Sequence, residues 1–171
     1  MKKFLLLLIL PVLLAGCKEQ PVMETVEDVQ IQPAATPLQM VVELPKNAAL
    51  PVMESDREKL YICDGFTISQ QILPGGDLQA TIRSTSGFPK ESLKIMQTKW
   101  DNATRYDFVW TAAGEGGQQV CRACVLDDGN YHYVLSASAD AADGGALQET
   151  WREMFDSFRL VSSEVSLHTG S

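Results

Sequence analysis

The sequence predicts an α+β domain in which an antiparallel sheet of about six strands is flanked by two helices, as an α/β/α sandwich. Several segments alternate apolar and polar residues and are separated by short turn sequences rich in Gly, Asp and Asn. This pattern is typical of consecutive antiparallel strands. Two further segments repeat apolar residues at helical spacing. The expected order is two or three strands, a helix, three strands, a helix and a closing strand.

The folded pattern begins near Asp56, and a short strand is expected over residues 59–63. The segments 66–72 and 78–82 both carry apolar residues at alternate positions. Between them lies the sequence Pro-Gly-Gly-Asp at residues 74–77, which is strong turn chemistry. We therefore expect these two segments to pair as a hairpin.

The first helix is expected to begin at Pro89. Proline suits the first helical position, and Glu91 would lie in the first turn, where the helix dipole favours an acid. Leu93, Met96 and Trp100 would then form one apolar stripe facing the sheet. A second helix is expected from the same kind of stripe, which consists of Leu147, Trp151, Met154 and Phe155.

Three consecutive strands are expected between these helices, because two tight-turn sequences, 114–117 and 127–130, divide the segment. A closing strand is expected over residues 157–161, and residues 163–171 read as a frayed tail. The three central strands are residues 105–110, 118–126 and 131–138.

The first of these strands places three aromatic side chains on one face, Tyr106, Phe108 and Trp110. A sheet covered by helices needs large apolar side chains inside, which makes these residues core candidates. The alternative is that the aromatic face stacks against a ligand. Both interpretations stay open at the level of the sequence.

The N-terminus has the form of an export signal. The pair Lys2-Lys3 precedes an apolar run, residues 4–14, that is too short to cross a hydrocarbon core of about 30 Å. The run ends in Leu14-Ala15-Gly16-Cys17, which resembles the bacterial lipobox. The resemblance implies that residues 1–16 are removed as a signal peptide. It also implies that Cys17 is acylated, with palmitate among its chains, and holds the protein at the extracytoplasmic side of the membrane. The alternative is an ordinary cysteine in a failed transmembrane helix.

Between this cysteine and the domain, residues 17–55 read as a flexible tether. The range contains no glycine and no regular apolar period. Five of the eight prolines fall within it: Pro21, Pro33, Pro37, Pro45 and Pro51. The alternative is that residues 38–44 form a strand at the edge of the domain. The expected domain itself spans residues 56–162.

The charge balance is acidic, with 14 Lys and Arg against 22 Asp and Glu and a net charge of −8. Such a chain is not expected to bind nucleic acid or an anionic membrane surface. Its contact with the membrane is expected through the lipid alone.

Three cysteines remain for the exported domain, Cys63, Cys121 and Cys124. Cys121 and Cys124 are three residues apart on an expected strand, so they point to opposite faces with Cα atoms about 10 Å apart, too far for a disulfide. We expect Cys63 to bridge one of the two, because exported proteins meet an oxidising environment. Three free buried thiols, or a redox or metal site, are the alternatives.

No catalytic signature is found in the sequence. It lacks Gly-x-Ser-x-Gly, and the only histidines are His132 and His168. A zinc site would have to combine His132 with cysteines that face different ways. The glycine clusters lie in turns and do not lead into a helix as a phosphate-binding loop does. We therefore expect no catalytic residue, no metal and no cofactor.

The order of elements, together with the closing residues Asp156-Ser157-Phe158-Arg159-Leu160, resembles the Mog1/PsbP-like α/β/α sandwich. The resemblance implies a non-enzymatic binding or accessory role. The first hypothesis is thus a membrane-anchored envelope lipoprotein with a binding or accessory domain and an envelope protein or small ligand as its partner. The second is a redox or metal-dependent activity centred on Cys121, Cys124 and His132. The third is capture of a small ligand on the aromatic face of Tyr106, Phe108 and Trp110.

Overall fold

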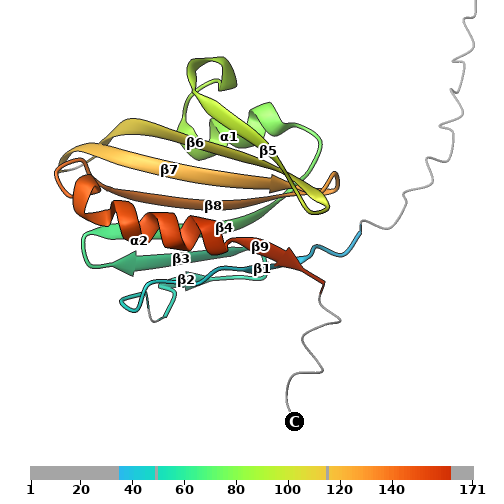
Figure 1. Cartoon of the computed structure of the whole chain (residues 1–171), viewed down its shortest axis with the longest axis horizontal. Helices are drawn as coiled ribbons and strands as arrows, with labels where there is room; N and C mark the ends of the chain where they lie inside the picture. Colours follow the sequence, from blue (N-terminus) through green and yellow to red (C-terminus); the bar gives the residue numbers. More distant parts are fainter. Residues whose placement is uncertain (1–34, 49, 115, 163–171) are drawn as a thin grey trace, which may run out of the picture. The chain divides into compact units, whose positions relative to one another are not determined.

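The computed structural model describes residues 35–48, 50–114 and 116–162, which belong to one compact unit (Figure 1). The predicted signal peptide, Cys17 and the predicted tail 163–171 lie outside the described residues. The strands are β1 (Gln39–Val41), β2 (Met53–Glu54), β3 (Glu58–Cys63), β4 (Phe66–Pro74), β5 (Ile95–Trp100), β6 (Ala103–Gly114), β7 (Gly117–Asp127), β8 (Tyr131–Asp140) and β9 (Arg159–Val161). The helices are α1 (Leu78–Ser86) and α2 (Gly144–Ser157), with a 3-10 turn over Lys90–Ser92.

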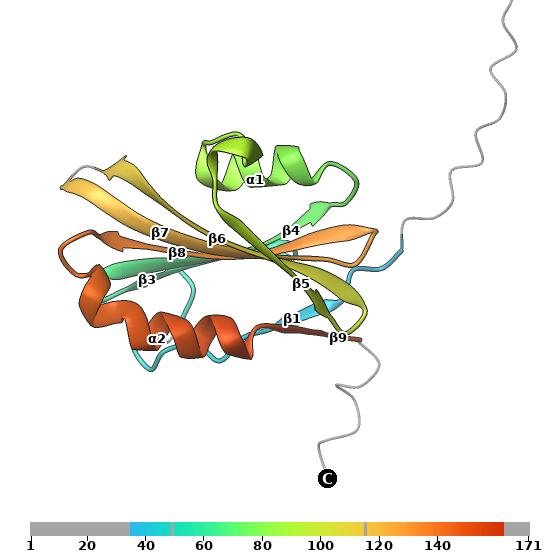
Figure 2. The same cartoon turned by 45° about the horizontal axis from the view of Figure 1, so that its top comes forward.

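Seven strands form the main sheet, in the order β2-β3-β4-β8-β7-β6-β5. Every neighbouring pair in it is antiparallel. The strands β1 and β9 form a separate two-stranded ribbon. Figure 2 shows α1 on one face of the main sheet and α2 on the other. The predicted α+β class, an antiparallel sheet between two helices, is therefore confirmed, with one strand more than the six or so expected.

Each face of the sheet has its own core. On β8, Tyr133 and Leu135 face α2, while His132 and Val134 face α1, because successive side chains of a strand alternate. The core under α2 includes Trp151, Met154, Phe155 and Phe158 together with Ile68, Leu126, Tyr133 and Leu135. The smaller core under α1 consists of Ile82, Tyr106, Phe108, Ala123, Val125 and Val134.

The predicted hairpin of residues 66–72 and 78–82 is wrong. The first segment is β4, but the second is the helix α1. Asp77 caps this helix, since its Oδ1 accepts a hydrogen bond from the Ala80 amide at 2.9 Å. Gly87 ends it in the left-handed conformation, with φ of 79°. Leu78 and Ile82 are four residues apart, so the same apolar residues that suggested a strand also share one face of a helix.

The predicted helix from Pro89 to Trp100 is also wrong. Only the short turn Lys90–Ser92 is helical, and Ile95–Trp100 is the edge strand β5. A two-residue turn, Asp101-Asn102, joins β5 to β6, and Trp100 pairs with Ala103. Met96 was expected on the sheet-facing side of the predicted helix, but its side chain is 63% exposed.

The central strands, the last helix and the closing strand follow the sequence prediction. The long strands β6, β7 and β8 contain the three expected segments and extend beyond each of them. The helix α2 contains all four residues of the expected stripe, and β9 lies within the expected closing strand.

Two strands lie within residues 17–55, for which the sequence favoured a tether. β1 falls inside the alternative strand 38–44 and pairs with β9, and β2 pairs with β3. Leu38 and Met40 pack against the core under α2, together with Val42 and Leu44. The described part of this range is thus in contact with the domain, because its scattered apolar residues have a core to cover.

Candidate functional site

The helix α1 covers only part of its face of the sheet, and a groove of about 400 Å³ lies beside its C-terminal end. The floor is formed by β4, β8, β7 and β6, and Thr85, Ser86 and Gly87 contribute the wall on the side of α1. The groove lies toward the β6–β7 hairpin, since Ala112 and Gln119, which are paired near its tip, also line it.

One row of side chains crosses the floor of the groove. Strand register places Trp110 opposite Cys121, Cys121 opposite Ser138, and Ser138 opposite Thr67. The row therefore spans four strands, or about 14 Å at the usual strand spacing. Thr67 and Ser138 share a hydrogen bond of 2.8 Å between their hydroxyl oxygens.

A second pair of hydroxyls adjoins this row. Ser69 and Ser136 face each other one strand repeat further along β4 and β8. Both side chains are half-buried, and neither makes a side-chain hydrogen bond to any residue that the structure describes. With Thr67 and Ser138 they form an array of four hydroxyls on two neighbouring strands.

Trp110 is held by its neighbour on the same face. Its ring centroid lies 5.5 Å from that of Phe108, at an interplanar angle of 31°. Phe108 is buried in the core under α1, whereas Trp110 is half-buried and lines the groove. The contact gives the indole a firm backing and leaves part of its surface open to the groove.

The groove is electrically neutral, because none of its lining residues carries a charged side chain. Its one sulfur group, Cys121, is buried, and burial raises the pKa of this thiol. A thiol with a raised pKa stays protonated near neutral pH, which makes it a poor nucleophile and a poor metal ligand. The groove is suited to uncharged hydrogen bonding and stacking.

A larger hollow of about 540 Å³ lies between β1 and the β2–β3 hairpin. Charges of both signs line it, and Lys59 pairs with Glu54 at 2.6 Å. Both partners are largely exposed, so the pair adds little to binding or stability. No aromatic residue lines this hollow, which makes the groove on the α1 face the better candidate.

The three aromatic residues predicted from the sequence do share one face, the face of α1. Tyr106 is 9% exposed and Phe108 is 2% exposed, so these two belong to the core. Trp110 alone lines the groove. The structure thus divides the predicted aromatic face between the core and the candidate site.

The expected disulfide is absent, because Cys63, Cys121 and Cys124 are all free and buried. Cys63 and Cys124 belong to the core under α2, and Cys121 lines the groove on the opposite face. Cys63 is on β3 and the other two are on β7, with β4 and β8 between. Three strand spacings amount to about 14 Å, which is well beyond disulfide reach. The opposite orientation of Cys121 and Cys124 agrees with the strand geometry expected from the sequence.

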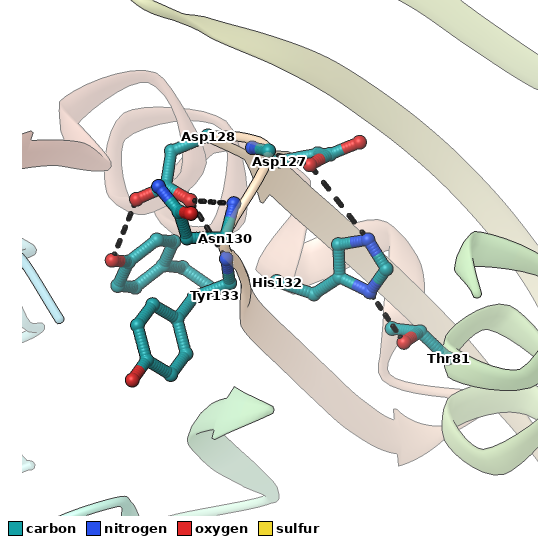
Figure 3. Close-up of polar contacts among 8 residues, drawn as sticks. Thr81, Asp127, Asp128, Asn130, His132 and Tyr133 are labelled. Atoms are coloured by element: carbon teal, nitrogen blue, oxygen red, sulfur yellow. Dashed lines mark hydrogen bonds and ion pairs between the residues drawn. The ribbon is translucent and has the colours of Figure 1, made fainter. Parts of the chain in front are cut away.

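His132 takes part in a buried polar chain at the other end of the α1 face (Figure 3). Its Nδ1 lies 2.7 Å from Thr81 Oγ1, and its Nε2 lies 3.8 Å from Asp127 Oδ1. The order Thr-His-Asp resembles a catalytic triad, but His132 is only 1% exposed, and Thr81 is a buried residue of α1 itself. The chain of contacts therefore holds α1 against β8 and offers no access to a substrate.

The residues of the redox or metal hypothesis do not come together. His132 pairs with Asp127, and Cys121 is six positions away from Asp127 along β7, or about 20 Å. Cys124 is on the opposite face. Within residues 35–48, 50–114 and 116–162, no three His, Cys, Asp or Glu side chains cluster as metal ligands would.

Buried charges on the α2 face were not anticipated from the sequence. Arg105 donates two hydrogen bonds to Asp107, at 2.6 and 2.9 Å, and a third to the Phe155 carbonyl oxygen at 3.0 Å. Arg122 lies over the Phe155 ring, 4.3 Å from its centroid. These contacts fix the last turn of α2 to the sheet, so we assign them a structural role.

Neither helix in the part of the chain that the structure describes is long and apolar enough to cross a membrane. The candidate lipidation site, Cys17, lies outside the described residues.

No protein-family model matches the chain, and no curated protein matches its sequence. Solved structures match its fold. LpqN of Mycobacterium tuberculosis, which is involved in cell envelope biogenesis, aligns with 11% identity and a TM-score of 0.52, over 77% of this chain and 87% of LpqN. A protein of Bacteroides thetaiotaomicron aligns with 10% identity and a TM-score of 0.50, over 73% of this chain. The match spans only 46% of the Bacteroides protein.

The Ran-binding protein Mog1p of Saccharomyces cerevisiae aligns with 10% identity and a TM-score of 0.48, over 74% of this chain and 92% of Mog1p. At such low identities a structural likeness describes the course of the backbone and assigns no function to a residue. The chain therefore has an α+β fold similar to that of LpqN.

Proposed function

We propose that the chain is an exported lipoprotein, held at the extracytoplasmic side of a bacterial membrane through acylated Cys17, whose domain binds a component of the cell envelope without catalysing a reaction. The observation that carries the proposal is Leu14-Ala15-Gly16-Cys17 at the end of a short apolar run. The similarity in fold to LpqN, a protein of cell envelope biogenesis, supports the same compartment.

A binding role is favoured over catalysis by the chemistry of the candidate site. Acid–base and nucleophilic catalysis need a titratable group that reaches the substrate. The groove is lined by hydroxyl, amide, thiol and indole groups, and burial raises the pKa of its thiol, Cys121. His132, the histidine nearest to such a role, is enclosed under α1.

The anchor is tested by labelling cells that produce the full chain with a palmitate analogue, followed by fractionation and mass spectrometry of the N-terminal peptide. We expect the protein to carry label, to lack residues 1–16 and to sediment with membranes. The variant Cys17→Ser should lose the label, because a hydroxyl cannot replace the thiol in lipid attachment. Cys121→Ala is the matched control and should keep it. A cytosolic protein that retains its first 16 residues would refute the proposal.

A further inference from the structure

We infer that the groove on the α1 face binds a neutral oligosaccharide, that is, a short chain of uncharged sugar rings. The inference rests on the binding function proposed above and names the class of ligand. It follows from three properties of the groove: its lack of charge, its array of hydroxyls and its half-buried indole.

The lack of charged side chains in the groove argues against anionic and cationic ligands. Sites for phosphates, carboxylates and cations commonly include side chains of opposite charge, because ionic hydrogen bonds offset the loss of hydration. No such side chain lines the groove, although the chain as a whole has 36 acidic and basic residues. A neutral ligand is the one that the groove can take up without leaving a charge unpaired.

The hydroxyl array argues for a ligand rich in hydroxyl groups. Each of Thr67, Ser69, Ser136 and Ser138 can both donate and accept a hydrogen bond, as a sugar hydroxyl does. A lipid or other apolar ligand would remove water from Ser69 and Ser136 without replacing the lost hydrogen bonds, which costs about 1–3 kcal/mol for each unsatisfied group. Gln119 adds an amide donor and acceptor at the end nearest the hairpin.

The indole of Trp110 supplies the apolar contact. A pyranose ring has a polar rim and an apolar face of C–H groups, and that face packs against an aromatic ring. Phe108 backs the indole on the core side, so its orientation is fixed before a ligand arrives.

The dimensions favour a chain of sugars over a single ring. Trp110 and Thr67 stand at opposite ends of a row about 14 Å long, which exceeds the length of one pyranose ring. The volume of about 400 Å³ lies within the range of small-ligand sites, about 300–1,000 Å³. The indole and the hydroxyl array can thus contact neighbouring units of one chain.

The test uses the purified full chain in a detergent without a sugar headgroup, titrated with chitotetraose, cellotetraose and maltotetraose, with tetragalacturonate as the charged comparison. Binding is followed by tryptophan fluorescence and by calorimetry. We expect at least one neutral tetrasaccharide to bind and the charged one to bind at least tenfold more weakly, because its carboxylates find no cationic partner.

Variants then locate the binding surface. Trp110→Ala should weaken binding by tenfold or more, and the double variant Ser69→Ala with Ser136→Ala by several-fold. Val109→Ala is the matched control: it is the neighbouring residue on β6, on the opposite face and 59% exposed, and it should bind normally. Unfolding curves confirm that each variant is folded.

The inference is overturned if no neutral tetrasaccharide binds at concentrations up to about 10 mM, if the charged one binds better, or if the folded Trp110→Ala variant binds normally. Each of these results leaves the lipid anchor untouched, since that is measured by label at Cys17. Failure of the saccharide inference and failure of the proposed anchor are therefore distinguishable.

Discussion

The thiol of Cys124 shows how a single buried residue links stability to pH. It is completely buried, and burial, with the nearby carboxylate of Asp107 as a second cause, raises its pKa above the ordinary 9.0. In the unfolded chain the thiol ionises near its ordinary pKa, while in the folded chain it keeps its proton. The unfolded state therefore binds fewer protons above about pH 9, and stability falls as the pH rises.

We predict that Cys124→Ala flattens this alkaline loss of stability. The free energy of unfolding, measured by urea titration between pH 7 and pH 10, should decline less steeply in the variant, by up to about 1.4 kcal/mol per pH unit. The smaller side chain also loses packing, but this lowers the free energy of unfolding equally at every pH. It therefore does not affect the slope. Asp64→Ala, which alters an exposed carboxylate, should keep the wild-type slope. Equal slopes for Cys124→Ala and the wild type would contradict the prediction.

At the same scale, the sequence identified Trp110 and Cys121 but not the hydroxyls beside them. Thr67 and Ser69 alternate with Phe66 and Ile68. This alternation is typical of any strand with one face toward solvent. Whether such polar residues face bulk water or a groove depends on how far α1 extends over the sheet. The local sequence pattern does not indicate how far α1 extends, so the hydroxyl array can be identified only from the structure.

Among the elements, α2 is held in place by a buried charge cluster. Arg105 and Asp107 are both nearly inaccessible, and Arg105 also donates to a carbonyl oxygen in the last turn of α2. A cation at a helix C-terminus is favoured by the helix dipole. Removing one partner of such a pair leaves the other charge buried without compensation.

We predict that Asp107→Leu lowers the free energy of unfolding by about 3–5 kcal/mol, as is usual when a buried ion pair loses one member. The double variant Arg105→Met with Asp107→Leu should recover a large part of this loss, since the buried charge of Arg105 is removed as well. Arg122, which lies 3.7 Å from Asp107, also loses this partner, but its side chain is 24% exposed and water can solvate it. Urea denaturation measures both. A double variant no more stable than Asp107→Leu would mean that the packing of these side chains, and not the charge, determines the loss.

The errors in element prediction have a common origin. Short segments such as 78–82 and 95–100 fit two periodicities at once, and the apolar residues alone do not choose between them. The deciding signals were the flanking residues: Asp77 and Gly87 as helix caps, and Asp101-Asn102 as a two-residue turn. The strands β6 to β8 were predictable because two tight-turn sequences separate them, and the helix α2 because its four-residue apolar stripe fits helical spacing.

For the whole molecule, the packing of β1 decides where the domain begins. The Leu38 amide donates a hydrogen bond of 2.8 Å to the Tyr133 hydroxyl, which itself donates to Asp128. Leu38 and Met40 also cover part of the core under α2. These contacts join residues far apart in the sequence, so composition, which favoured a tether up to residue 55, could not reveal them.

We predict that a chain beginning at Glu43 is less stable than one beginning at Ala35, by about 2–4 kcal/mol, because it lacks β1 and the partly buried Leu38, Met40 and Val42. The longer chain keeps all of these contacts and serves as the control. Urea unfolding of the two chains gives the difference directly. Identical unfolding curves would place the start of the stable domain after β1.

The ribbon of β1 and β9 also determines which end of the domain can carry an addition. Gln39 lies opposite Val161, so the polypeptide enters and leaves the domain at one end, beside the β7–β8 turn (Figure 1). The groove lies toward the β6–β7 hairpin at the other end. A reporter fused after Val161 would therefore lie at the end of the domain away from the groove and leave the groove open. An epitope inserted at the tip of the β6–β7 hairpin would instead obstruct the groove.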